Sequence, residues 1–87
     1  MPINPDNIRE VVLNNPQLIS VESIAEYFET STVQLNRILK KYDTSGLLVL
    51  KSIKQDIVKD MMVQDKSLEE ISKRVGYSIN YIKRNLL

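Results

Sequence analysis

The fold is decided by two stretches of sequence, VESIAEYFETSTVQLNRI at residues 21–38 and LEEISKRVGYSINYIKRN at residues 68–85. They align without a gap at an offset of 47 residues, which pairs Ile24 with Ile71 and Leu35 with Ile82. In each copy, apolar residues at helical spacing come before a short polar turn and are followed by a second helical pattern. We therefore interpret each copy as a helix-turn-helix, in which the second helix can enter a DNA major groove.

The aligned positions have physical reasons to be alike. The small residues Ala25 and Ser72 suit a point where two helices cross closely. Gly76 suits a turn that needs a positive φ, whereas Glu29 takes that position in the first copy and predicts strain or a different turn. Two serines are expected to cap the second helix of each pair, namely Ser31 and Ser78.

No segment alternates with period two, so the chain is expected to be all-α. Asn4 and Pro5 are expected to begin a first helix. Residues 47–64 carry an apolar stripe and predict a helix about 27 Å long. In the last helix Tyr81, Ile82 and Leu86 are expected to face inward. The predicted organisation is a first helix-turn-helix lobe at 1–45, a connector helix at 46–65 and a second helix-turn-helix lobe at 66–87.

Charge is distributed unevenly along the chain. The formal net charge of +1 argues by itself against a nucleic-acid-binding protein. However, no acidic residue lies between Glu29 and Asp43, or from Ile71 to the C-terminus. These two segments contain the basic residues Arg37, Lys40, Lys41, Lys73, Arg74, Lys83 and Arg84. Chance clustering on solvated faces would explain either segment alone, but both fall at matching places of the repeat.

The composition disfavours an enzyme. The chain has no cysteine and no histidine, so it lacks the commonest metal ligands and the commonest general base. Asp56 and Asp60 lie one helical turn apart, but they alternate with Lys54 and Lys59, and we expect solvated ion pairs. We predict no cofactor and no metal. No apolar run approaches about 20 residues and no signal peptide is recognisable, so a cytoplasmic protein without membrane contact is expected.

The run MMVQDKSLEEISKRVGY at residues 61–77 resembles the entry to the second motif of the AraC/XylS family of bacterial transcription regulators. That family usually shows two apolar residues, a short polar stretch, and then Ser-Ile-x-Glu-Ile-Ala-x-x-Val-Gly-Phe. LNRILKK at residues 35–41 is similar to the family's Leu-x-Arg-x-Phe-Lys-Lys. The resemblance covers residues 18–87 and implies two DNA-reading motifs joined by a helix.

The chain also departs from that family. It is one residue shorter between Gly76 and Arg84, the family's final helix is missing, and there is no room for a sensing domain. Three interpretations remain open: a free-standing minimal member, a regulator encoded by a phage or mobile element, and a truncated chain.

The expected function is sequence-specific binding of double-stranded DNA by two helices in successive major grooves, as a monomer or homodimer. Base-edge contacts are expected from Thr32, Val33, Asn36 and Arg37 in one groove and from Ser78, Asn80 and Lys83 in the other. Lys40, Lys41 and Arg84 are expected to bind phosphates, and Ser31 belongs to the same surface.

Other functions remain open. Arg37 could instead form an intramolecular ion pair with Glu26 or Glu29. The whole chain could be a protein-interaction module, such as an anti-activator or a factor that binds RNA polymerase, which the low net charge favours. A helix-turn-helix module of phage DNA packaging or a fragment similar to a sigma factor is a further alternative.

Overall fold

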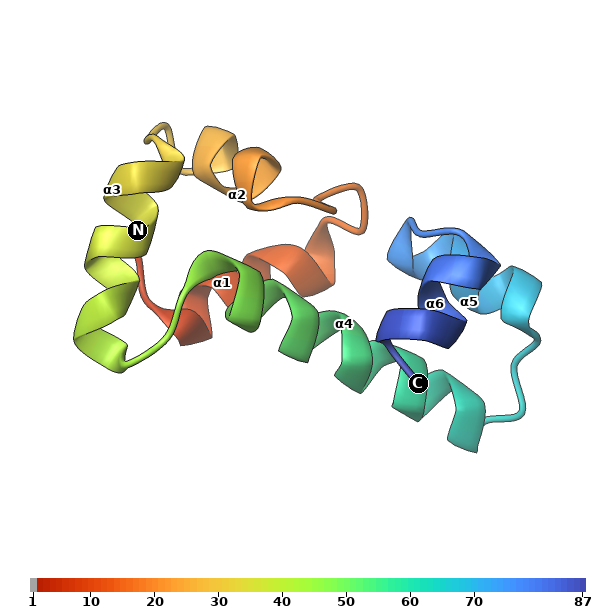
Figure 1. The fold of residues 1–87 in the computed structure, drawn as a ribbon. Coiled ribbons are helices and arrows are strands. Elements are labelled where there is room, and N and C mark those ends of the chain that lie inside the picture. Colours follow the sequence, from red (N-terminus) through yellow and green to blue (C-terminus); the bar gives the residue numbers. More distant parts are fainter. Residues whose placement is uncertain (1) are drawn as a thin grey trace.

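A computed structural model describes residues 2–87, and this part of the chain is helical without any strand (Figure 1). The elements are α1 (Pro5–Asn14), α2 (Val21–Tyr27), α3 (Thr32–Leu39), the 3-10 turn η1 (Lys40–Tyr42), α4 (Gly46–Val63), α5 (Leu68–Val75) and α6 (Ile79–Asn85). The predicted all-α fold is confirmed. None of these helices combines the length and the apolar character that crossing a membrane requires.

Each α-helix begins at a polar side chain that accepts a hydrogen bond from a backbone N–H of the first turn. Asn4 caps α1 through the amide of Asn7 at 2.8 Å. Serines cap the other five. These bonds satisfy amides that have no partner inside the helix, and they define where the helices start. The caps expected at Asn4, Ser31 and Ser78 are confirmed.

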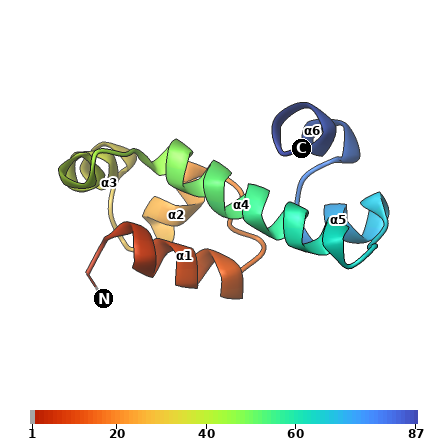
Figure 2. The same ribbon diagram turned by 90° about the horizontal axis from the view of Figure 1, so that it is seen from below.

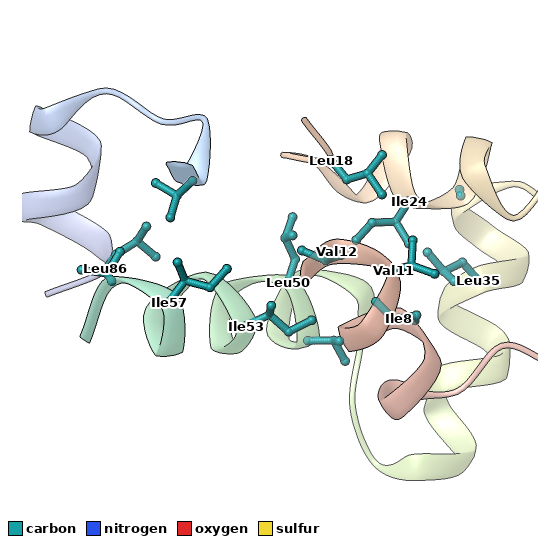
Figure 3. Packing of buried hydrophobic residues seen from close by; sticks show 14 of the residues in the cluster. Ile8, Val11, Val12, Leu18, Ile24, Leu35, Leu50, Ile53, Ile57 and Leu86 are labelled. Atoms are coloured by element: carbon teal, nitrogen blue, oxygen red, sulfur yellow. The ribbon is translucent and has the colours of Figure 1, made fainter. Parts of the chain in front are cut away.

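The long helix α4 forms the axis of the molecule. Its N-terminal part packs against α1, α2 and α3, whereas α5 and α6 lie along its C-terminal part (Figures 1 and 2). One continuous cluster of buried side chains follows α4 from Leu50 through Ile53 to Ile57, which lies beside Leu86, the residue after α6 (Figure 3). The segment expected to act as a connector is therefore part of the hydrophobic core along most of its length.

The two helix pairs, α2–α3 and α5–α6, repeat the same local structure at the offset found in the sequence. Glu29 and Gly76, which are aligned, both adopt the left-handed conformation, with φ of 56° and 83°. The strain expected at Glu29 is present, because a side chain in this region meets the neighbouring backbone. The aligned anchors of the second helices, Leu35 and Ile82, both have no exposed surface.

Two sequence-based expectations about α4 and α6 are wrong. Tyr81 was expected to be buried, but 40% of its surface is exposed. Lys54 was expected to form a solvated ion pair with an aspartate, but it is completely buried. Asp56 pairs instead with Arg9 of α1, with an N–O distance of 2.8 Å between two exposed side chains.

Candidate nucleic-acid interface

The first candidate surface comprises the exposed side of α3 and η1. Val33, near the start of α3, exposes 68% of its surface. Arg37 and the two lysines of η1, Lys40 and Lys41, are also exposed. Across residues 2–87 the one ion pair is that of Arg9 with Asp56, so Arg37 does not form the alternative pair with Glu26 or Glu29. Its guanidinium group is therefore available to a partner.

Asn36 is exposed and has an internal contact that the sequence did not predict. Its side-chain oxygen accepts a hydrogen bond of 2.8 Å from the backbone N–H of Gly46, the first residue of α4. A bidentate contact with adenine needs both the oxygen and the nitrogen of the amide. This bond ties Asn36 to the start of α4, while the amide oxygen keeps a second lone pair and the amide nitrogen keeps its N–H groups.

The second candidate surface is the exposed side of α6. Ser78, Asn80, Lys83 and Arg84 are all exposed there. The hydroxyl oxygen of Ser78 accepts from the backbone N–H of Tyr81 at 3.2 Å, as that of Ser31 does from Gln34 at 3.1 Å. Each serine keeps its hydroxyl proton for donation to an outside acceptor.

The two candidate surfaces lie toward opposite ends of α4. Figures 1 and 2 show α3 and α6 running across the direction of α4. The Cα trace measures 37 Å along its longest axis and 21 Å along the other two. Thr32, Val33, Arg37, Lys40 and Lys41 therefore gather at one end, and Ser78, Asn80, Lys83 and Arg84 belong to the helix near the other.

Three side chains of the second half of the molecule donate hydrogen bonds to backbone carbonyls at the end of α1 and in the loop between α1 and α2. The ammonium group of Lys54 donates to the carbonyl of Pro16 at 3.2 Å and to that of Val75 at 2.9 Å. The guanidinium group of Arg74 donates to the carbonyl of Leu13 at 3.0 Å, and the hydroxyl of Tyr77 donates to the carbonyl of Ile19 at 2.6 Å. We call these three donors, Lys54, Arg74 and Tyr77, the carbonyl clamp.

The carbonyl clamp holds two positive charges inside the molecule, although the sequence predicted both on its outer surface. Arg74 belongs to the acid-free basic segment of the second copy, yet its guanidinium group packs between the two halves of the molecule. Lys54 follows Leu50 and Ile53 and precedes Ile57 at helical spacing. That position on the apolar stripe was the one signal in the sequence that Lys54 would be buried.

Burial changes the ionisation of two members of the carbonyl clamp. Burial, with a smaller contribution from the nearby positive charge of Arg74, lowers the pKa of Lys54 from 10.5 to about 8. The ammonium nitrogen also lies 5.6 Å from the centre of the Tyr77 ring, within the range of a cation–π contact. Burial and the neighbouring Tyr81 raise the pKa of Tyr77 from 10.0 to about 12.

Comparison of the chain with protein-family models, with curated proteins and with solved structures found no match. We therefore infer a function from the internal repeat and from the residues that the fold leaves exposed.

Proposed function

We propose that the chain is a sequence-specific DNA-binding transcription regulator of the AraC/XylS type. In this proposal α2–α3 and α5–α6 are two helix-turn-helix motifs, and α4 connects them. One observation carries the proposal: each helix pair has a left-handed residue before a serine-capped second helix that exposes basic side chains. Repetition of the turn, the cap and the charge at one offset favours a shared role over two unrelated helical hairpins.

The dimensions of the molecule are compatible with binding across one face of a duplex. Successive major grooves are about 34 Å apart. The longest dimension of the Cα trace, 37 Å, is of the same order, and α3 and α6 lie toward its opposite ends. In this arrangement the carbonyl clamp would hold the two helix pairs at a constant separation, because it ties α4, α5 and the turn after α5 to the end of α1 and to the loop that enters α2.

The exposed side chains divide into two expected roles. Arg37 lies about one and a half turns past the cap of α3, where a long side chain can reach the groove floor and pair with guanine. Asn80 in α6, whose side chain is exposed, is proposed to pair with adenine. Lys40 and Lys41 follow the end of α3 in η1, where the chain emerges toward the phosphates.

The charge distribution supports an oriented complex despite the net charge of +1. Five exposed cations belong to the two surfaces: Arg37, Lys40, Lys41, Lys83 and Arg84. The logarithm of the binding constant falls with the logarithm of salt concentration by about 0.9 for each phosphate contacted. If three or four of these side chains bind phosphates, the slope is expected to be about −3.

The test is selection from a randomised DNA duplex pool, followed by fluorescence anisotropy with the selected duplex at several salt concentrations. Arg37→Ala is expected to weaken binding by about 1–3 kcal/mol and to relax preference at one base pair. Lys40→Ala should weaken all sequences alike and reduce the salt slope by about one. Lys59→Ala, which removes an exposed cation from α4, serves as the matched control and should change neither quantity.

The possible results separate the alternatives. An equal loss of affinity for every sequence in Arg37→Ala would show that Arg37 is not a base reader. If wild-type protein selects no sequence and shows no salt dependence, the DNA-binding proposal is wrong.

A protein-interaction module is the second candidate, and one observation favours it. Leu47 and Leu48, neighbours at the start of α4, expose 61% and 59% of their surfaces. Large apolar side chains that are both exposed and adjacent are common in protein interfaces. Binding to a protein partner through Leu47 and Leu48 would be insensitive to salt and lost in the Leu48→Lys variant, whereas the DNA affinity of that variant would be unchanged.

A further inference from the structure

A cavity of about 300 Å³ lies between the two helix pairs. Its walls come from the start of α2, from one side of α4, and from the turn before α6 and α6 itself. Ile19, Val21 and Leu47 supply apolar surface, and Tyr81 closes the side formed by α6. Its volume is at the lower end of the range for small-molecule sites, which are also concave and mainly apolar.

The polar residues of this cavity carry more positive than negative charge. Lys51 and Lys54 lie three residues apart on α4 and so face the same side of the helix. Glu22 is the one acidic residue among the lining side chains. It forms no ion pair with either lysine, since the ion pair found among residues 2–87 joins Arg9 and Asp56.

Lys54 adds a buried charge that no carboxylate neutralises. Two of its three N–H groups donate to backbone carbonyls, and its ammonium nitrogen lies near the face of the Tyr77 ring. The guanidinium group of Arg74, close by, adds a second positive charge. A buried cation without a counter-charge is costly, and an anion within a few ångströms would stabilise it.

We propose that this cavity binds a small organic monoanion, namely a carboxylate with an aromatic or short aliphatic body. The apolar body lies against Leu47, Ile19 and Tyr81. The carboxylate points toward α4, where Lys51 has an exposed ammonium group to pair with it directly. Lys54 acts through its charge, because its hydrogen-bonding capacity is largely used by the two carbonyls.

A ligand in this position would touch both helix pairs. Ile19 and Val21 belong to the first half of the molecule, and Tyr81 belongs to α6. Occupancy would therefore change how firmly the two halves are held together. An effect on DNA affinity would depend on the proposed function, whereas binding of the carboxylate does not and can be measured without DNA.

The test is a titration of the ¹⁵N-labelled full chain with sodium 4-phenylbutyrate, followed by two-dimensional amide NMR. The neutral isostere 4-phenylbutyramide is titrated in parallel. We expect saturable shifts at the amides of Val21, Leu47 and Tyr81, with a Kd of about 1 mM or tighter for the carboxylate. The amide should bind at least about tenfold more weakly, since it lacks the charge.

Two exposed lysines on the same helix provide a matched pair of variants. Lys51→Gln should weaken carboxylate binding about three- to tenfold, and Lys59→Gln, outside the cavity, should leave it unchanged. Direct NMR titration of Lys54 should show its pKa rising when the carboxylate binds. Absence of saturable shifts, equal binding of the two isosteres, or equal effects of the two variants would each overturn the proposal.

Discussion

Raising the pH above 8 is expected to stabilise this protein, because of the buried Lys54. In the folded chain the pKa of this lysine is lowered from 10.5 to about 8. Between these two values the unfolded chain binds more protons than the folded chain, so the free energy of unfolding rises with pH. The full cost of burying the charge is present below about pH 8 and is relieved as the lysine deprotonates.

The magnitude follows from the two pKa values. A tenfold change in an equilibrium constant corresponds to about 1.4 kcal/mol. The difference between 10.5 and about 8 therefore sets an upper bound of about 3.5 kcal/mol on the stabilisation, approached above pH 10.5. The gain between pH 8 and pH 10 should be smaller, about 2 kcal/mol, because pH 10 is still below the pKa of this lysine in the unfolded chain.

Urea denaturation followed by far-UV circular dichroism, at half-unit steps from pH 7 to pH 11, measures this change. Lys54→Met is the comparison variant, because it keeps an unbranched side chain of similar length and cannot titrate. Its free energy of unfolding should lack the rise between pH 8 and pH 10. A flat wild-type curve over this interval, or the same rise in Lys54→Met, would refute the assignment to Lys54.

Three further predictions concern stability. Leu35→Ala and Ile82→Ala, which truncate fully buried anchors of α3 and α6, should each reduce the free energy of unfolding by about 2–5 kcal/mol; thermal melts indistinguishable from wild type would show that these anchors are misassigned. Glu29→Gly should stabilise the protein by about 1 kcal/mol because it relieves a left-handed glutamate. By contrast, Gly76→Ala should destabilise it by at least as much, because φ is 83° and a Cβ would meet a side-chain carbon at 2.7 Å; chemical denaturation giving both changes the same sign would contradict this account. Tyr77→Phe should cost about 0.5–1.5 kcal/mol at pH 7 through its lost hydrogen bond. Because the pKa of Tyr77 is raised to about 12, wild-type stability should also begin to lose a contribution above pH 10, and that loss should be absent from Tyr77→Phe when the urea series is extended to pH 12.

The helices and their limits could be predicted from the sequence because the interactions that define them are local. A cap joins residues three positions apart, as Ser31 and Gln34 or Ser78 and Tyr81 do. The left-handed turn at Gly76 was likewise indicated by the residue itself, which has no Cβ to obstruct it. At the aligned Glu29 the repeat left two outcomes open, strain or a different turn, and the structure has the left-handed turn with φ of 56°.

The candidate site could be predicted only in part. Exposure of Arg37, Lys40 and Lys83 agreed with their positions on amphipathic helices, because the opposite faces carry the apolar residues. The role of Asn36 could not be predicted, since its partner is the backbone of Gly46, beyond a turn whose path the sequence leaves open. The prediction that Tyr81 is buried was wrong because this side chain lines a cavity whose walls come from three separate helices.

The sequence by itself determined the all-helical character, the caps and the repeated turn, since each depends on residues within about one helical turn of each other. Only the tertiary structure decided how the two helix pairs are joined. Lys54 meets the carbonyl of Pro16, 38 positions away, and Arg74 meets that of Leu13, 61 positions away. Such bonds use backbone acceptors that every residue possesses, so no residue type marks the partner in advance. They form because the packing around α4 removes these donors from water and leaves the carbonyls within reach.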